Sequence, residues 1–198
     1  MKVTKIVGQV KTRGRYSIFI DDKFTFGISE LGLINSGLKV GAELTSKELS
    51  NLKSDAKTDK IFNQVLSLIM RRPRSQWEVE NYLKRKGVDL QVSDGLILTL
   101  KEKGFVDDLD FAKRWVENRR LLKPISKRKL EFELRQKRIS DNLTKQVLAD
   151  DETEDIDVLT EEVARKRQQS RYQDDTKLMR YLAGQGYRYD DIKRALSG

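Results

Sequence analysis

The sequence predicts a mainly α-helical protein of three tandem three-helix repeats, preceded by a small antiparallel β-rich N-terminal region. Three observations support this fold class. Apolar and polar residues alternate along the first 28 residues, as they do in strands. From about Ser46 onward apolar residues recur at helical spacing, and the sequence has only two prolines, Pro73 and Pro124. One helical pattern then returns at intervals of 51 and 48 residues.

We assign residues 1–45 to the β-rich region. Three segments alternate in the manner of strands, KVTKIVGQV, RYSIFID and KFTFGIS, and Asp21 and Asp22 supply a turn between the last two. A short helix near SELGLINSG is expected to end at Gly37, because glycine readily adopts the left-handed conformation that terminates helices. Thr45 or Ser46 should begin the next helix, with Glu48 placed to complete a capping box.

The repeated pattern starts at Ser75, Ser126 and Asp174, three residue types that favour the N-cap of a helix. Apolar residues follow four and eight positions after each cap, and this spacing places them on one helix face. They are Val79 and Leu83, Leu130 and Leu134, and Leu178 and Leu182. Twelve positions after the caps stand Gly87, Arg138 and Gly186, where a helix would end in the left-handed conformation.

Each of these helices is expected to lie between two others. Helical segments precede the caps, namely FNQVLSLIM, FAKRWVENRRLL and EEVARKRQQS, and a second short amphipathic helix follows each apolar face. The repeating unit is therefore three helices in about 50 residues. We expect repeats at residues 46–108, 109–150 and 151–198, each of which shares part of its buried surface with its neighbours.

The charge distribution indicates the kind of partner. The formal net charge is +9, and it divides into +3 over residues 1–59, +9 over 60–148 and −3 over 149–198. A basic middle region suits a polyanion or an acidic protein surface. The sequence has no cysteine and no histidine, which excludes disulfides, zinc sites built on those ligands and triads with a histidine base. The sequence has no apolar signal core and no run of transmembrane length, so we expect a cytoplasmic protein without membrane contact. We also expect a monomer.

Three segments resemble the RecX family of recombinase regulators: RRPRSQWEVENYLKRKG, KEKGFVDDLDFAKRWVENR and KRKLEFELRQKRIS. The matching residues are Arg72, Arg74, Ser75, Glu78, Leu83, Lys86 and Gly87, then Gly104, Phe105, Val106, Asp107, Asp108, Phe111 and Ala112, and finally Glu133, Leu134, Lys137 and Ile139. Two positions depart from the family pattern. Val79 replaces a leucine, and Arg138 replaces the glycine at a helix end, which leaves the form of that turn open.

The resemblance covers residues 60–198 well and residues 1–59 only in layout. It implies a curved array of three-helix repeats that binds the RecA recombinase filament along its groove and suppresses ATP hydrolysis and strand exchange. It also implies a modulator and not an enzyme. We expect no cofactor and no metal. The alternative is a helix-turn-helix-like protein that acts directly on nucleic acid, and binding of free single- or double-stranded DNA stays open.

The strongest candidate surface is residues 119–138, with nine basic and two acidic side chains. On the predicted helix, Phe132 points away from Leu130 and Leu134, and Trp77 has a similar outward position in the first repeat. An exposed aromatic among cations suits a protein groove or a stacked base, whereas packing on a neighbouring repeat is the alternative. The candidate binding residues are Arg71, Arg72, Arg74, Trp77, Arg119, Arg120, Lys123, Lys127, Arg128, Lys129, Phe132, Arg135, Lys137 and Arg138.

Four other features are less specific. Trp115 is expected to pack in the core or between repeats. Asp107 and Asp108 are expected to stabilise a helix N-terminus and not to bind a metal. The segment GLINSGLKV does not match a phosphate-binding loop, because its lysine is misplaced and no Ser or Thr follows. Residues 150–157, with six acids, predict a solvated linker and helix start, or alternatively an acidic segment that folds onto residues 119–138 and regulates partner access.

Overall fold

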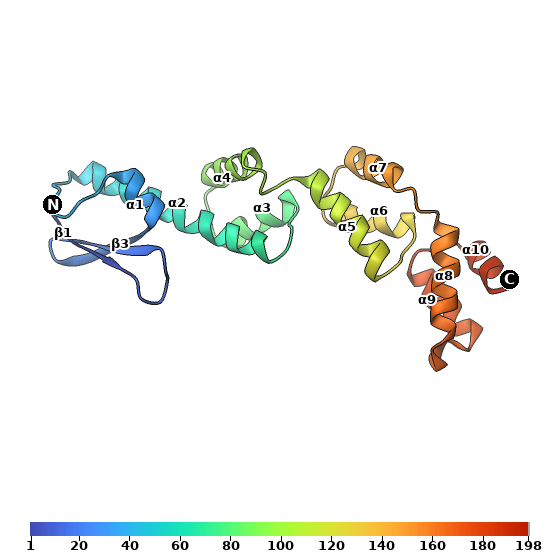
Figure 1. The fold of residues 1–198 in the computed structure, drawn as a ribbon. Coiled ribbons are helices and arrows are strands. Elements are labelled where there is room, and N and C mark those ends of the chain that lie inside the picture. The colour runs from blue at the N-terminus through green and yellow to red at the C-terminus, as the bar shows by residue number, and fades with distance from the viewer. Residues whose placement is uncertain (198) are drawn as a thin grey trace. The chain divides into compact units, whose positions relative to one another are not determined.

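The computed structural model describes residues 1–197, which contain ten α-helices, one 3-10 helix and one three-stranded sheet (Figure 1). The mainly α-helical class with an N-terminal antiparallel sheet is therefore confirmed. The chain forms two compact units, one of Met1–Arg72 with Val88–Leu96, the other of Pro73–Gly87 with the chain from Ile97 onward. The expected limits of the individual repeats stay a prediction.

The sheet of the first unit consists of three antiparallel strands in the order β1 (Val3–Gly8), β2 (Arg15–Ile20) and β3 (Lys23–Ser29). Asp21 and Asp22 form the two-residue connection between β2 and β3, with φ of 46° and 62°. Positive φ at both positions is what a tight hairpin of matching twist requires, and aspartate tolerates it better than most residues. The expected turn is confirmed.

Two helices complete the first unit. α1 (Glu30–Ser36) ends at Gly37, whose φ of 62° is left-handed as predicted. α2 (Ser46–Arg71) begins at Thr45, which forms the expected capping box with Glu48. α2 lies on the sheet, where Ala56 joins a core of buried strand residues: Val3, Ile18, Ile20, Phe26 and Ile28. Asp59 of α2 also accepts hydrogen bonds from the backbone and hydroxyl of Ser29, at 3.1 and 2.8 Å.

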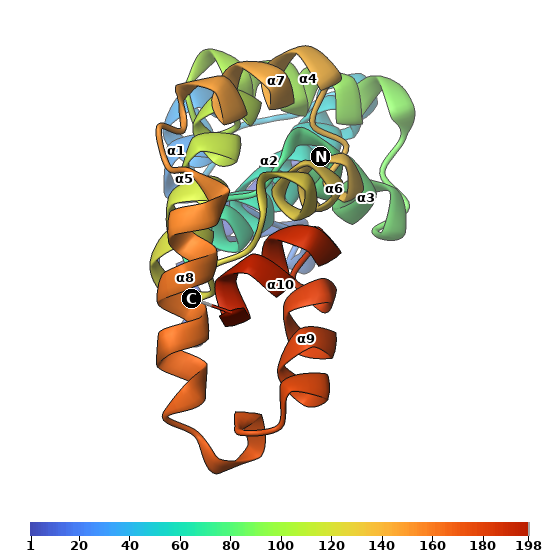
Figure 2. The same ribbon diagram turned by 90° about the vertical axis from the view of Figure 1, so that its right-hand side faces the viewer.

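The remaining helices are α3 (Gln76–Arg85), α4 (Leu90–Glu102), α5 (Asp108–Leu122), α6 (Lys127–Gln136), α7 (Asp141–Asp150), α8 (Asp155–Arg167), η1 (Ser170–Tyr172), α9 (Asp175–Gly184) and α10 (Tyr189–Ser197). Hydrophobic cores organise the described part of the second unit from α5 onward. Phe111, Val116, Leu130, Leu134 and Val147 hold α5, α6 and α7 together. A second core of Leu159, Leu178, Leu182 and Ile192 holds α8, α9 and α10, which Figure 2 shows as a separate three-helix group.

The helices α3, α6 and α9, which we call the middle helices, have the predicted spine. Ser75, Ser126 and Asp174 cap them, and each cap side chain accepts a hydrogen bond from the backbone three residues later. The apolar residues at the fourth and eighth positions are fully buried, with 0% exposure in all six cases. These local patterns were sufficient to place the helices because a cap and one apolar face define both the start and the orientation of a helix.

The middle helices also end alike. Gly87, Arg138 and Gly186 have φ of 66°, 58° and 93°, so all three are left-handed. The departure at Arg138 therefore changes the residue and not the turn. An arginine in this conformation lacks the freedom of glycine, because its Cβ crowds the following carbonyl. Buried Ile139 and Tyr187 follow the last two turns and anchor them in the cores.

Candidate partner-binding surface

The C-terminal turn of α6 lies against the N-terminus of α3. The hydroxyl of Ser75 donates a hydrogen bond to the backbone carbonyl of Lys137, at 3.0 Å. The ammonium of Lys137 pairs with Glu78 at 2.9 Å. One carboxylate oxygen of Asp108 accepts a hydrogen bond from the backbone N–H of Gln76 at 2.8 Å. Burial raises the pKa of Asp108, which the Gln76 hydrogen bond and nearby Lys101 partly oppose.

The same junction recurs between α9 and α6. The backbone N–H of Ser126 donates to the carbonyl of Gln185 at 3.1 Å. Asp155 accepts from the backbone N–H of Lys127 at 2.9 and 3.0 Å, as Asp108 does from Gln76. The left-handed turn fits closely here, since a Cβ built on Gly186 would lie 2.4 Å from the Ser126 hydroxyl. Successive middle helices are thus joined N-terminus to C-terminal turn.

Several of the predicted binding residues face outward on the middle helices. Trp77 is 38% exposed and Phe132 is 52% exposed, so neither is packed into a core. The outward prediction for Phe132 is confirmed, and Arg128 and Arg135 are exposed on the same helix. Aromatic and cationic side chains of this kind are typical of surfaces that bind another macromolecule.

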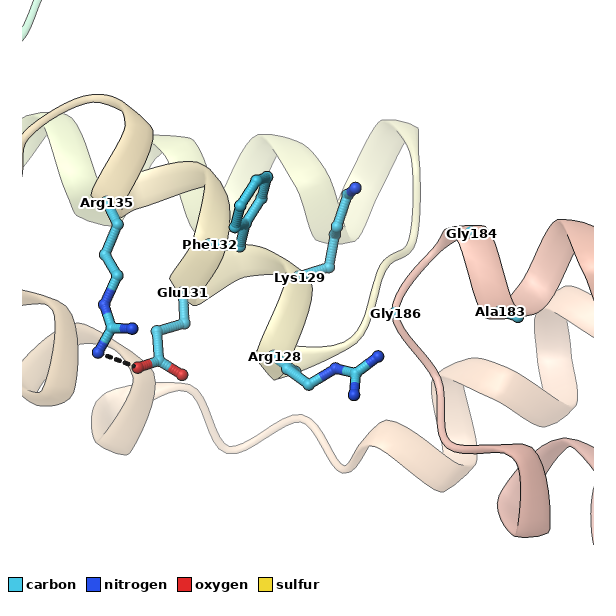
Figure 3. Close-up of a pocket in the computed structure, with 8 residues that line it drawn as sticks. All are labelled: Arg128, Lys129, Glu131, Phe132, Arg135, Ala183, Gly184 and Gly186. Atoms are coloured by element: carbon cyan, nitrogen blue, oxygen red, sulfur yellow. Dashed lines mark ion pairs between the residues drawn. The ribbon is translucent and has the colours of Figure 1, made fainter.

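A groove of about 430 Å³ lies where α6 meets the end of α9. We call it the α6–α9 groove; it is lined by Arg128, Lys129, Glu131, Phe132, Arg135, Ala183, Gly184 and Gly186 (Figure 3). Figure 3 shows Lys129 and Phe132 projecting side by side from α6, and the ammonium of Lys129 lies 5.4 Å from the ring centre. Arg135 pairs with Glu131 at 2.9 Å and with Asp141 at 3.2 Å.

Four of the predicted basic residues hold the fold together. Arg119 pairs with Glu133 at 2.7 Å, and Arg120 pairs with Asp151 at 2.7 Å. The ammonium of Lys127 donates to the backbone carbonyl of Asp151 at 2.8 Å. Lys137 belongs to the α6–α3 junction through its pair with Glu78. The long run of positive charge in residues 119–138 is therefore divided between internal pairs and an outward set.

The other predicted residues occupy different parts of the chain. Arg71 ends α2 and Arg72 caps it, so both belong to the first unit. Arg74 and Trp77 belong to the second unit, where Arg74 is half-buried. Lys123 follows α5 as its C-cap, and Arg138 forms the left-handed turn after α6; both are exposed. Within the described part of the second unit, Arg128, Lys129, Phe132 and Arg135 of α6 line one groove together with the end of α9.

Trp115 packs as expected against the core of α5, α6 and α7. Its ring stacks on Phe111 with centroids 5.7 Å apart, and its indole N–H donates to Glu133 at 2.9 Å. Arg119 and Lys137 lie over the ring at 4.9 and 5.0 Å. Trp115 thus orients two of the internal cations instead of presenting a binding face.

Part of the acidic segment 150–157 does fold onto the basic stretch, but as packing. The side chain of Asp151 is only 8% exposed and forms an ion pair with Arg120. Asp155 is the first residue of α8, and its carboxylate accepts a hydrogen bond from the backbone at the start of α6. Burial opposes the ionisation of Asp151, yet the hydrogen bonds from Arg120 and Thr153 outweigh it, so the pKa of Asp151 lies below its ordinary value. The expected solvated linker is therefore partly buried.

Asp107 caps α5 as predicted, since its carboxylate accepts from the backbone N–H groups of Leu109 and Asp110 at 2.8 and 3.1 Å. Residues 1–197 contain no group of three acidic side chains arranged to hold a metal ion. None of the described helices combines the length and the apolar character that a bilayer crossing would need.

Sequence reasoning did not assign Gly184 or Gly186 to the candidate surface, although both line the α6–α9 groove, and it predicted Gly186 only as a left-handed helix end. A signal was present, because the segment AGQG carries two glycines where the repeat needs one. In the aligned positions the first repeat has Lys84 and Arg85, and the second has Arg135 and Gln136, where the third has Ala183 and Gly184. Of the three repeats, only the third has small residues at both positions.

Comparison with known proteins identifies related domains along most of the chain. Models of RecX domains match three segments: the N-terminal domain of regulatory protein RecX at residues 1–45, the first three-helix domain at 62–100 and the second three-helix domain at 107–148. The three-helix organisation expected from the repeats is thereby confirmed.

Curated relatives carry the name regulatory protein RecX. The protein from Clostridium botulinum (strain Alaska E43 / Type E3) is 30% identical over 199 aligned residues, which cover 97% of this chain and 93% of the relative. The protein from Leuconostoc mesenteroides is 27% identical, with 96% and 72% covered. A relative from Lactobacillus johnsonii is 31% identical over 76% of this chain, which spans 56% of that longer protein.

Two solved structures share the fold. A crystal structure of regulatory protein RecX aligns with a TM-score of 0.71 and 21% identity, over 100% of this chain and 99% of the other. RecX from Lactobacillus salivarius aligns with a TM-score of 0.58 and 18% identity, over 71% of this chain and 94% of the other.

Proposed function

This chain belongs to the RecX family of regulatory proteins, and we propose on that basis that it binds the RecA recombinase filament and inhibits its ATPase and DNA strand-exchange activities. The partner would be RecA on DNA, and the protein itself would act as a cytoplasmic monomer without catalysis or a cofactor. The absence of histidine and cysteine is consistent with a binding role, because both are the commonest side chains of catalytic and metal sites.

The observation that carries the proposal is the pair of matching junctions between the middle helices. A filament presents the same surface at regular intervals, and a protein built from repeated units can contact more than one protomer. The two junctions, at Ser75 and at Ser126, use the same elements in the same order. Exposed Trp77 and Phe132 then offer aromatic contacts on successive middle helices.

Inhibition would follow from differential binding. A protein that bridges two protomers in one state of the filament stabilises that state against the others, and ATP hydrolysis requires the protomers to pass between states. A tenfold preference for one state corresponds to about 1.4 kcal/mol, which a few contacts of ordinary strength can supply. No chemistry by this chain is needed.

The proposed contact residues fall into two groups. Those that would touch the partner are Arg71, Arg72, Arg74, Trp77, Lys123, Arg128, Lys129, Phe132, Arg135 and Arg138. Arg119, Arg120, Lys127 and Lys137 would act indirectly, because their side chains hold the helices and the junctions of the second unit in place. Loss of a residue from the second group should disturb stability first and binding second.

The direct test is the DNA-dependent ATPase of RecA with and without this protein, in wild-type form and as the triple variant Arg128→Ala, Phe132→Ala, Arg135→Ala. We expect the wild type to lower the rate at stoichiometric amounts and the triple variant to lose most of this effect. Lys113→Ala with Lys145→Ala, which removes exposed charge from α5 and α7, is the matched control and should inhibit normally. An unaltered ATPase with the wild type would overturn the proposal.

Direct action on nucleic acid is the second candidate, favoured by one observation. Residues 60–148 carry a net charge of +9 and include both Trp77 and Phe132, which are exposed. Cations interleaved with aromatic side chains are typical of single-strand binding surfaces. Binding to free DNA that weakens steeply with salt but shows no sequence preference would fit either function. A single preferred duplex site would rank this function above filament binding.

A further inference from the structure

We propose that the α6–α9 groove binds an acidic segment of the protein partner. An apolar side chain of that segment would pack between Phe132 and Gly184, and a carboxylate would pair with Arg128. This inference rests on the proposed function, which it deepens by naming the chemistry that the groove recognises. Four features of the groove support this proposal. The ring of Phe132 is exposed, Gly184 has no side chain, Arg128 has no ion pair within residues 1–197, and Lys129 covers one face of the Phe132 ring.

Phe132 is not required by the architecture of the repeat. The aligned residues on the other two middle helices are Asn81 and Arg180, which are polar and leave their helices intact. The burial of the helix face is complete without it, because Leu130 and Leu134 are fully buried. A phenylalanine that is 52% exposed beside a groove gains stability only when a partner covers it.

Gly184 is likewise not required by the fold. It is the last residue of α9, it has no left-handed φ, and a Cβ built on it would meet nothing within 4 Å. The aligned residues, Arg85 and Gln136, show that the repeat accepts a long side chain here. Glycine at a helical position costs stability relative to almost any other residue. Its effect in this chain is to leave one side of the groove open.

Charge in the groove is only partly paired. Arg135 is compensated by Glu131 and Asp141, at 2.9 and 3.2 Å. Lys129 lies over the ring of Phe132, and in the described residues no carboxylate pairs with Arg128. Within this part of the chain Arg128 is thus in no direct ion pair, although Glu131, Glu154, Asp155 and Asp191 line the adjoining cavity with it, and a carboxylate of the partner would pair with it directly.

A nucleic acid fits the groove less well. The ammonium of Lys129 lies over Phe132 at 5.4 Å and covers a face on which a base would stack. Glu131 lines the groove and would repel a phosphate backbone. Two cations without direct ion pairs in the described residues suit one or two carboxylates, whereas a nucleic-acid track presents a phosphate at every nucleotide.

The decisive variant is Gly184→Gln, which fills the groove with the residue that the second repeat carries at this position. It should fold at least as well as the wild type, because glutamine favours helices more than glycine does. Thermal unfolding checks this. Thr160→Gln, on the exposed side of α8, adds the same side chain elsewhere and is the matched control.

Two binding measurements use these variants. In the first, fluorescence anisotropy follows labelled peptides in which one leucine is flanked by glutamates, or by lysines, or in which alanine replaces the leucine between glutamates. Titrated to about 1 mM, the wild type should bind the glutamate–leucine peptide about tenfold more tightly than either of the others. Gly184→Gln and Phe132→Ala should each lose that preference, and Thr160→Gln should keep it.

In the second, the same variants bind RecA filaments and, separately, oligo(dT). We expect Gly184→Gln to weaken filament binding about tenfold or more and to leave oligo(dT) binding unchanged. Absence of the peptide preference in the wild type overturns the inference, and so does an equal loss of oligo(dT) binding, which would identify a nucleic acid as the occupant. Failure of the wild type to bind filaments overturns the proposed function alone, since the peptide measurement decides the groove independently.

Discussion

Ser75 and Lys137 lie 62 residues apart in sequence and are joined by a hydrogen bond of 3.0 Å from the serine hydroxyl to the lysine carbonyl. The same hydroxyl accepts from the backbone N–H of Glu78, and Ser75 has no exposed surface. One side chain therefore caps α3 and fastens it to the turn that ends α6. A helix cap in this protein is thus also the joint between two middle helices.

Replacing Ser75 with alanine should cost more than the loss of an ordinary cap. The cap alone is worth about 1 kcal/mol, and leaving the Lys137 carbonyl without its donor in a buried place adds about 1 to 3 kcal/mol. Ser140→Ala is the control. Ser140 caps α7 at an exposed position, and within residues 1–197 its hydroxyl forms no hydrogen bond to another helix. Urea unfolding of both variants measures the difference. Equal losses would show that the junction contributes nothing.

Local patterns in the sequence were enough to predict the caps, the buried faces and the three strands, since each depends on residues within one turn or one hairpin. The junctions were not predicted. Ser75 resembles any N-cap serine, and nothing near it in sequence indicates that Lys137 lies above it. Contacts between the middle helices depend on tertiary packing, which one sequence without aligned relatives does not reveal.

The candidate site was predicted in part for a related reason. Counting charges identified residues 119–138 as a basic surface, but the carboxylates that neutralise Arg120 and Lys137 come from Asp151 and Glu78, outside that range. Phe132 was placed correctly because its outward position follows from the buried positions of its own helix. Helical periodicity thus separates inside from outside, but it does not separate paired cations from unpaired ones.

Gly186→Ala should destabilise the protein more than Gly87→Ala does. Both glycines are left-handed, so each substitution carries a strain of about 1 to 2 kcal/mol. A Cβ at Gly87 meets nothing within 4 Å, whereas a Cβ at Gly186 would lie 2.4 Å from the Ser126 hydroxyl and 2.7 Å from the Cβ of Lys129. The α9 turn must then move away from α6.

Urea unfolding gives the free energies of the two glycine variants, and hydrogen exchange reports whether α8, α9 and α10 open separately. We expect the amides of these helices to exchange faster in Gly186→Ala than in Gly87→Ala. If both variants lose the same stability and keep the wild-type exchange pattern, the close approach at Ser126 does not matter to the junction.

Arg138→Gly should stabilise the protein slightly. Arg138 has a φ of 58°, and glycine would remove the left-handed strain of about 1 to 2 kcal/mol. Glycine also makes the unfolded chain more flexible, which offsets about 0.4 to 1 kcal/mol of that gain. A net increase of about 0 to 1.6 kcal/mol in the free energy of unfolding is therefore expected. Arg138→Ala keeps the strain without the charge and should show no such increase.

Asp151→Asn should lower stability at neutral pH and have little effect in acid. The Asp151 carboxylate receives Arg120 at 2.7 Å, and the Arg120 side chain is only 11% exposed. The amide keeps the shape but loses the charge-assisted hydrogen bonds, which are worth about 1.5 to 3 kcal/mol. Because the pKa of Asp151 is lower in the folded protein than in the unfolded chain, its contribution is present above the unfolded pKa and is lost as the pH falls through the folded pKa.

The difference in unfolding free energy between wild type and Asp151→Asn should therefore be largest near pH 7 and should shrink toward acid. The effect of pH on the contribution of Asp108 to stability has the opposite sign. Its pKa is raised in the folded protein, so ionisation of this carboxyl opposes folding. The backbone N–H of Gln76 can donate to an amide oxygen as well, so Asp108→Asn should keep the junction and lose no stability at pH 7. Urea titrations of both variants from pH 3 to pH 7 separate the two cases. If the difference in unfolding free energy between wild type and Asp151→Asn does not change with pH, the loss of stability comes from packing and not from charge.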